Sequence, residues 1–354
     1  MIKIKISSLA SILTAALVCT PLLTQAANPY QSLNNNYGVS GGNVNDITNS
    51  FCCSGTLGSM LTSGTTYYIL SNNHVLARQD QASLGEDISQ PGLIDNGCRP
   101  PRTVADFTKA VHLGNNVDCA IAQLRPNTMV TTGYIEGIGV PSSTTKNPTV
   151  GMAVQKSGRT TGHTTGTIGS INTSVNVQYQ LRCGQGKKYV LSYTNQVLIN
   201  SSSFSAGGDS GSLIITNDTN KNPVALLFAG SSTTTIGNPI NEVLTKLSGV
   251  GYSVHFTGPT GGASSASSAT AAGAQGLQLP QQALDHANTI LEQNRHELMS
   301  KPGVLGVGLG ALEDNSQAAV IVYVDKTSSA KPQLPERVDN VAVRVIFTDP
   351  FIAY

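Results

Sequence analysis

The chain has 354 residues, a length that allows two or three domains, and its hydrophobic fraction of 39% is sufficient for ordinary cores. Only 12% of the residues are charged, about half the usual share, and the poor helix formers Gly, Ser, Thr and Asn take their place. This composition favours short strands and turns over long surface helices. The formal net charge of +1 gives no reason to expect a nucleic-acid partner.

Residues 1–26 are predicted to be a secretory signal peptide. Lys3 and Lys5 precede an apolar run at residues 9–18, and residues 24–26 (TQA) offer a small-residue cleavage site. An uncleaved membrane anchor is the alternative, but the apolar run is shorter than the ~20 residues that a span needs. We therefore expect a secreted protein, extracellular or periplasmic, with no membrane attachment after signal removal.

Five cysteines remain after the signal: Cys52, Cys53, Cys98, Cys119 and Cys183. They can be oxidised in an exported protein, and their odd number leaves at least one unpaired within the chain. The sequence leaves the pairing open. No Cys-x-x-Cys pair or Cys/His cluster has the spacing of a zinc site, so no metal or other cofactor is expected.

Short apolar runs separated by turn residues dominate the chain up to residue 257. They include residues 67–70, 119–122, 189–193 and 213–215. Many short strands with such punctuation predict an all-β domain at residues 27–257, either a barrel or a sandwich. One helix is predicted near its end, because the apolar residues Ile240, Val243, Leu244 and Leu247 follow a helical period and Gly249 can end it.

Residues 258–280 are expected to be a flexible linker, since Gly, Ser, Ala and Thr make up almost all of residues 258–276. The character of the sequence then changes to a small α+β module at residues 281–354. Its helix is marked by Leu284, Ala287, Leu291 and Leu298, and strand-like runs follow at 319–324 and 341–347. Residues 306–311 (GVGLGA) superficially match a dinucleotide fingerprint, but they follow a helix instead of a strand, so no dinucleotide site is expected.

The strongest chemical motif is residues 207–212 (GGDSGS). Glycines on both sides of Ser210 favour a tight turn that presents its hydroxyl. The backbone N–H groups of Gly208 and Ser210 can then converge on one oxygen as an oxyanion hole, which stabilises charge that develops in the transition state. The alternative is an ordinary glycine turn with a solvent-facing serine.

A serine nucleophile needs a base and a carboxylate that orients it. His74 directly follows a strand-like run, and Asp118 lies among apolar residues (VDCAIA), where a carboxylate is costly to bury without a partner. The order His74, Asp118, Ser210 differs from that of the α/β-hydrolases, which place the serine first, and of the subtilisins, which place the aspartate first.

Residues from about 53 to 251 resemble the trypsin-like (chymotrypsin-clan) serine peptidases, and within them a bacterial and plant group that includes the narrow-leaf proteins. The resemblance lies in residues 53–58 (CSGTLG), 69–75, the Asp118 segment and 207–214. It implies an all-β fold of two six-stranded antiparallel β-barrels, with the catalytic triad His74, Asp118 and Ser210 between them. It also implies hydrolysis of peptide bonds in polypeptide substrates.

Residues 158–162 (GRTTG) are similar to a segment of streptogrisin-type enzymes. This resemblance implies that Arg159 forms an ion pair with Asp209 and so supports the oxyanion loop. By the same analogy, Phe204 lies at the floor of the primary substrate pocket. The wall is expected from Ala229, Gly230 and Ser231; because none of these residues is acidic, a preference for Arg or Lys is not implied.

The chain departs from the family pattern at Val75, which stands where a cysteine normally follows the catalytic histidine, so the usual disulfide to Cys53 cannot form. The expected function is a secreted serine endopeptidase that works through an acyl-enzyme. Two alternatives stay open: a binding protein on a protease fold without turnover, and an esterase with the same triad. The C-terminal module is expected to pack on the protease domain, to aid its folding, to inhibit it or to bind a partner.

Overall fold

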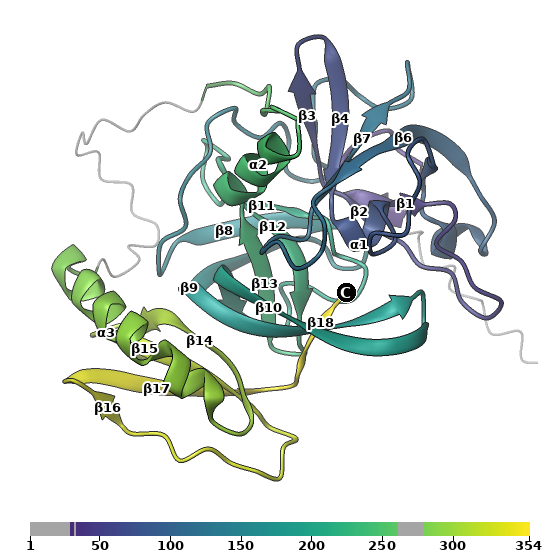
Figure 1. Cartoon of the computed structure of the whole chain (residues 1–354). Helices are drawn as coiled ribbons and strands as arrows, with labels where there is room; N and C mark the ends of the chain where they lie inside the picture. The colour runs from purple at the N-terminus through teal and green to yellow at the C-terminus, as the bar shows by residue number, and fades with distance from the viewer. Residues whose placement is uncertain (1–28, 32, 261–278) are drawn as a thin grey trace, which may run out of the picture.

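A computed structural model describes residues 29–31, 33–260 and 279–354 of the chain. The predicted signal peptide and most of the predicted linker lie outside the described residues. Figure 1 shows two β-barrels and a third unit made of the C-terminal part of the chain. Within the described ranges, no helix is long and apolar enough to cross a membrane.

The first barrel is a sheet of antiparallel strands in the order β2-β1-β5-β6-β7-β4-β3. Only Gly58 separates β2 from β3, and its N–H donates to the carbonyl of Leu70 (3.0 Å). The two segments therefore act as one bent strand, which closes the sheet into a six-stranded barrel. The elements of this part are η1 (Pro29–Gln31), β1 (Val39–Asn43), β2 (Gly55–Leu57), β3 (Ser59–Ser63), β4 (Thr66–Ser71), α1 (Asn73–Leu76), β5 (Asp87–Gln90), η2 (Leu93–Asn96), β6 (Arg102–Ala110) and β7 (Ala120–Leu124).

The second barrel contains six antiparallel strands in the order β10-β13-β12-β11-β8-β9, and β10 also pairs with β9, which closes the ring. Its elements are β8 (Ala153–Gly158), β9 (Gly162–Arg182), β10 (Gln185–Asn200), β11 (Leu213–Thr216), β12 (Pro223–Gly230) and β13 (Thr234–Pro239). The long β9–β10 hairpin extends past the other strands (Figure 1). The helix α2 (Ile240–Gly249) follows, as its apolar period predicted.

Helix α2 joins the two barrels. Although it follows the last strand of the second barrel, its residues Ile240, Val243 and Leu247 are buried in the same cluster as Leu57, Ile69 and other core residues of the first barrel. Burial of apolar area on this scale is the main favourable contribution to folding. The two barrels are therefore held in a fixed relation, which matters for any site formed between them.

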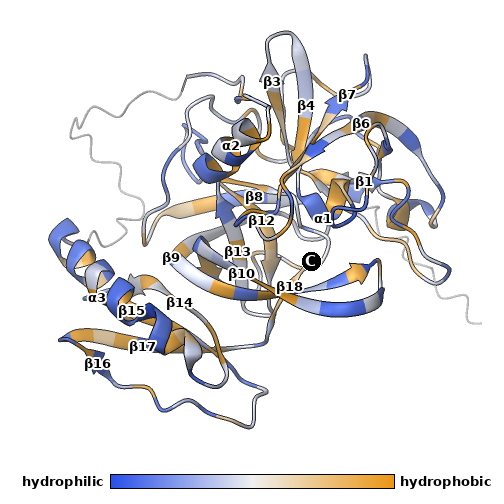
Figure 2. Cartoon of the chain, in the orientation of Figure 1, coloured by the Kyte–Doolittle hydropathy of each residue, from blue (hydrophilic) through white to orange (hydrophobic). Residues whose placement is uncertain are grey.

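The C-terminal unit consists of α3 (Gln281–Ser300), β14 (Val304–Ala311), β15 (Ala318–Asp325), β16 (Arg337–Val338), β17 (Val341–Thr348) and β18 (Phe351–Ala353). Helix α3 packs on β14 and β15, with Ala287, Leu291 and Leu298 buried beneath it. Figure 2 shows that β17 is largely apolar and that α3 carries many hydrophilic residues. The predicted helix and strand-like runs are confirmed, and so is the fold class: two six-stranded antiparallel β-barrels plus a small α+β module.

The module shares a sheet with the second barrel. Strand β14 pairs antiparallel with β9, for example Gly306 with Val175 and Leu309 with Ile171. The shared sheet is covered by one apolar cluster that includes Tyr193 of the barrel and Tyr323 of the module. The module is therefore docked on the protein through both backbone pairing and side-chain packing.

Candidate active site

The register of the first barrel brings His74 and Asp118 together. Ser71 in β4 pairs with Ala120 in β7, so the residues that follow Ser71 lie at the same edge of the sheet as those that precede Ala120. The Nδ1 of His74 lies 2.6 Å from Oδ2 of Asp118, and the His74 backbone N–H donates to Oδ1 (3.2 Å). Both side chains are buried, and a buried carboxylate needs such partners.

Ser210 lies in a loop of the second barrel that is fixed by the first. The backbone N–H of Thr56 in β2 donates to the Ser210 carbonyl (2.8 Å), and the Thr56 hydroxyl donates to the Gly208 carbonyl (2.9 Å). Gly208 and Gly211 have φ angles of 97° and 94°, in the region that favours glycine. The loop therefore has the tight turn that the sequence predicted. The roles of Gly208 and Ser210 as oxyanion donors stay predictions.

The backbone of Tyr354 connects these groups. The Nε2 of His74 lies 2.9 Å from the Tyr354 carbonyl oxygen. The carbonyl oxygen of Phe228 accepts hydrogen bonds from both the Ser210 hydroxyl (3.2 Å) and the Tyr354 N–H (3.4 Å). Figure 1 places the marked C-terminal end of the chain at the junction of the two barrels, close to α1. The structure thus pairs His74 with Asp118, but the Ser210 hydroxyl is bonded to Phe228 and not to His74, whose Nε2 instead faces a residue contributed by the C-terminal module.

Two tyrosines of the second barrel form a hydrogen-bonded chain that ends on Asp118, and neither was predicted from the sequence. The hydroxyl of Tyr179 in β9 donates to Oδ2 of Asp118 (2.9 Å) and lies 2.7 Å from the hydroxyl of Tyr193 in β10. Burial raises the pKa of both tyrosines, and the charge of Asp118 raises it further, so both hydroxyls stay neutral and can donate. Their strand context predicted burial, but no local signal pointed to a carboxylate partner on another barrel.

Opposing effects act on the pKa of His74. Burial lowers it, while the charge and hydrogen bond of Asp118, the Tyr354 carbonyl and the charge of Asp46 raise it; the result is a pKa above the ordinary value. Because a carboxylate oxygen and a carbonyl oxygen both only accept hydrogen bonds, the geometry with Tyr354 in place corresponds to an imidazolium that donates from both nitrogens.

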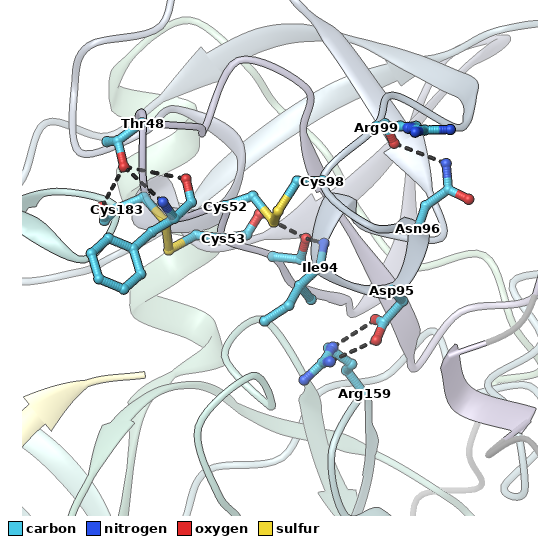
Figure 3. The surroundings of a disulfide bond; sticks show 12 residues. Thr48, Cys52, Cys53, Ile94, Asp95, Asn96, Cys98, Arg99, Arg159 and Cys183 are labelled. Atoms are coloured by element: carbon cyan, nitrogen blue, oxygen red, sulfur yellow. Dashed lines mark hydrogen bonds and ion pairs between the residues drawn. A yellow bond between two sulfur atoms is a disulfide. The ribbon is translucent and has the colours of Figure 1, made fainter.

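The predicted ion pair between Arg159 and Asp209 is wrong. The cation beside Asp209 is Lys156, whose Nζ lies 3.4 Å from Oδ2, and both side chains are fully buried. Arg159 instead forms an ion pair with Asp95 of η2, with two contacts of 2.6 Å (Figure 3). The reason is positional: Lys156 lies within strand β8 and points into the barrel, whereas Arg159 follows the end of β8 and reaches outward to η2.

Neutral donors complete the surroundings of Asp209. Its oxygens accept from the backbone N–H groups of Thr160 (2.8 Å), Thr161 (3.2 Å) and Ala206 (2.9 Å), and from the Thr161 hydroxyl (2.7 Å). Burial lowers the pKa of Lys156, and Asp209 raises it in part. The residue before Ser210 is therefore anchored from several sides, which fixes the loop. A lysine within the otherwise uncharged strand at residues 153–158 was the signal that could have identified this pair.

Three of the four predicted pocket residues, Phe204, Gly230 and Ser231, lie near the side chain of Tyr354. Its ring packs against the apolar cluster that contains Phe204, and its hydroxyl donates to the Ser231 carbonyl (2.8 Å). A Cβ on Gly230 would lie 2.3 Å from the Tyr354 hydroxyl oxygen, so the ring fits only because this residue is glycine. Ala229 pairs with Ala353. The roles of these residues in substrate binding stay predictions.

Two neighbouring disulfides border the site. Cys52 pairs with Cys98 and Cys53 pairs with Cys183, as Figure 3 shows, while Cys119 is buried and unpaired. The second bond attaches the tip of the β9–β10 hairpin to the chain just before β2. Cys53 thus pairs with Cys183, because the cysteine that is its usual partner in the resembling family is replaced by Val75 in this chain.

A cavity of about 250 Å³ lies beside His74, on the side of the Tyr354 carbonyl. Its walls include Asp46, Ile94, Gly208 and the Cys53–Cys183 bond. Burial raises the pKa of Asp46 to about 6, although the positive charges of His74 and Arg78 lower it in part. Among the residues that the structure describes, no group of three or more His, Cys, Asp or Glu side chains is arranged to hold a metal ion.

No family model matches the sequence, and no curated protein matches it. Several solved structures are similar. One is described as "a glutamic acid specific serine protease" that "utilizes a novel histidine triad in substrate binding"; it is 22% identical, with 62% of this chain and 99% of that chain covered and a TM-score of 0.44. Protease A of Thermobifida fusca is 19% identical (63% and 98% covered, TM-score 0.41), and a Nocardiopsis protease is 18% identical (57% and 92% covered, TM-score 0.41).

Proposed function

We propose that this protein is an exported serine endopeptidase with His74, Asp118 and Ser210 as its catalytic triad. The observation that carries the proposal is an extended segment, Phe351–Ala353 with Tyr354, that lies in the junction of the barrels with its backbone bonded to Phe228 and His74. A site that holds a polypeptide backbone by main-chain pairing suits peptide substrates. A short acyl ester would leave this pairing unused, which favours a peptidase over the alternative esterase.

The chemistry follows from the arrangement. With a substrate in place of residues 351–354, Nε2 of His74 is released, and the Ser210 hydroxyl turns from the Phe228 carbonyl toward it. His74 then takes the hydroxyl proton as the Ser210 oxygen attacks the carbonyl carbon of the substrate. Asp118 keeps Nδ1 protonated and offsets the charge of the imidazolium. The N–H groups of Gly208 and Ser210 are proposed to stabilise the oxyanion. His74 then protonates the leaving amine, and water, activated by the same base, hydrolyses the acyl-enzyme to regenerate Ser210.

Activity measurements on two forms of the protein test the proposal: the mature chain, and the same chain without residues 351–354, which occupy the site. Casein and short acyl esters are the substrates, and a fluorophosphonate probe reports on the serine. We expect cleavage of casein in preference to the esters, and modification of Ser210. The variant Ser210→Ala should lose about a million-fold in turnover.

Ser202→Ala is the matched control, because Ser202 is an exposed serine in the same loop region and should retain activity. A shortened chain that folds but neither reacts with the probe nor cleaves casein would identify the protein as a protease fold without turnover. Faster hydrolysis of the esters than of casein would favour the esterase.

A further inference from the structure

The second barrel has an open strand edge beside Ser210. On one side of β12, β13 pairs through Ala229 and Gly230, but on the other side the pairing of β11 ends at Leu227. An open edge presents unpaired backbone groups to which another strand can bind. Strand β18 takes this edge, antiparallel to β12, with Ala353 opposite Ala229 and Ile352 opposite Gly230.

The register of β18 places the main chain of Tyr354 beside both the proposed base and the proposed nucleophile. Its carbonyl oxygen is 2.9 Å from the Nε2 of His74, the atom that has to exchange a proton with the nucleophile. Its N–H shares the Phe228 carbonyl with the Ser210 hydroxyl. An oxygen at this distance from Nε2 occupies the position that a leaving group or an attacking water takes when it exchanges a proton with the base.

We propose that residues 351–354 are bound as the acyl-side half of a peptide substrate, with Tyr354 in the primary pocket. The C-terminal module is then an intramolecular competitive inhibitor, and the side chain of Tyr354 in the pocket identifies the substrate class: peptides with tyrosine on the acyl side of the cleaved bond. This inference rests on the proposed function, since it assigns an occupant and a specificity to the same site.

The pocket matches a phenol. Burial raises the pKa of Tyr354 to about 12, so its hydroxyl stays neutral and donates to the Ser231 carbonyl. Phenylalanine would leave that carbonyl without this donor, and it would also lose the hydrogen bond between the Ser205 side chain and the phenol oxygen. A lysine or arginine would bring a charge against the apolar cluster of Phe204. A site that hydrogen-bonds a substrate hydroxyl discriminates against analogues that lack it.

The module holds the segment in place. Phe351, the first residue of the segment, is buried, and its ring centroid lies 5.9 Å from that of Tyr323. It also pairs with Val177 of β9. Arg295 of α3 reaches the second barrel as well, with hydrogen bonds to the Asn172 carbonyl (3.0 Å) and the Ser174 hydroxyl (2.9 Å). Docking of this kind gives the segment a high effective concentration at the site, so even a weak peptide contact blocks it efficiently.

The test compares the mature chain, the chain lacking residues 351–354 and the variant Tyr354→Gly, which retains the strand. All are assayed on a tyrosyl peptide p-nitroanilide and with the fluorophosphonate probe. We expect a rate increase of about 100-fold for the deletion and an intermediate increase for Tyr354→Gly. Phe347→Ala is the matched control, because Phe347 is an aromatic residue of the module that is 58% exposed; its rate should equal that of the unaltered chain.

A synthetic peptide with the sequence of residues 348–354 provides a second measurement. Added to the deletion variant, it should raise KM without changing kcat, and the same peptide with phenylalanine at its end should bind about tenfold more weakly. Faster cleavage after Lys, Arg or Glu than after Tyr would overturn the substrate class.

Equal rates and equal labelling of the mature chain and the deletion variant would overturn the inhibitor while leaving the peptidase intact. Absence of both labelling and turnover in every folded form would instead overturn the proposed function. Circular dichroism of each variant establishes that it is folded.

Discussion

At the scale of single residues, the candidate site depends on partners that come from both barrels. Asp118 of the first barrel accepts hydrogen bonds from His74 and from Tyr179 of the second. Tyr193 extends this chain by one more hydroxyl. Hydrogen bonds of this kind orient the groups that act directly on a substrate. In metal sites, where such bonds orient the ligands, their loss typically lowers affinity or activity about 10–100-fold. Tyr179 is therefore a positioning residue in the proposed mechanism.

Tyr179→Phe should lower kcat about tenfold in the chain lacking residues 351–354. It should also move the acid limb of the pH profile upward, because Asp118, with one donor fewer, stabilises protonated His74 more strongly. Tyr189→Phe is the control: Tyr189 stacks on Tyr179 with ring centroids 5.7 Å apart, and its hydroxyl bonds to Gln79. If the midpoint of the acid limb does not move in Tyr179→Phe and only the free energy of unfolding falls, Tyr179 contributes packing and does not position Asp118.

The sequence was informative at this scale wherever the signal was local. The flanks of His74, Asp118 and Ser210 and their order singled them out; the structure pairs the first two, while the Ser210 hydroxyl bonds to the Phe228 carbonyl. Lys156 stands out as a lysine in an otherwise uncharged strand, but its partner is 53 positions away; Tyr179 carried no local signal for its partner, which is 61 positions away. The expected partner of Arg159 was wrong for the same reason: the resemblance matched a motif and could not show the direction of a side chain.

At the scale of elements, the β9–β10 hairpin is long and exposed for much of its length, and a single covalent bond attaches its tip. Cys183 lies at that tip, and the bond to Cys53 closes a loop of 130 positions. The entropy that the unfolded chain loses through such a loop grows with its length. This bond is therefore expected to stabilise both the fold and the walls of the cavity beside His74.

The double variant Cys53→Ser/Cys183→Ser should lose about 2–5 kcal/mol in the free energy of unfolding. Urea denaturation followed by fluorescence or circular dichroism measures the difference. Cys119→Ala is the matched control, since Cys119 is buried but forms no disulfide. If the double variant is no less stable than this control, the bond does not constrain the fold as argued.

Elements with a clear period were predictable, and elements formed by tertiary pairing were not. Helices α2 and α3 carry apolar residues at helical spacing, and both form where expected. Strand β18 has three residues, too few for an alternation to be visible, and it is extended because β12 and β9 pair with it. The glycine-rich β14 was likewise not predicted as a strand; its pairing with β9 and β15 defines it.

At the scale of the whole molecule, docking of residues 351–354 is coupled to protonation of His74, the proposed base. The Tyr354 carbonyl raises the pKa of His74, so by linkage the protonated form of His74 holds the segment more tightly. The groups that also act on the pKa of His74 are Asp118 and Asp46, and the Tyr179 ring packs edge-on against it. The contact between His74 and the Tyr354 carbonyl therefore stabilises the docked segment fully below the ordinary pKa of His74. This stabilisation is lost as pH rises through the raised pKa of His74.

The mature chain should consequently gain more activity with rising pH than the chain lacking residues 351–354. The ratio of the two rates, deletion over mature, should fall as pH rises from about 6.5, the ordinary pKa of histidine. Parallel pH profiles on the tyrosyl substrate measure it, with Phe347→Ala expected to follow the mature chain. A ratio that is constant between about pH 6 and pH 9 would contradict the coupling.

The pairing of β14 with β9 has a consequence for the lifetime of the latent state. A nick within residues 258–280 removes the covalent tether but leaves this ladder and its apolar cover unchanged. We expect the two fragments to stay together as a tight complex in which residues 351–354 remain beside His74. Under the proposed function, activity then begins only when the C-terminal fragment dissociates or is degraded, and cleavage within residues 258–280 does not by itself release it.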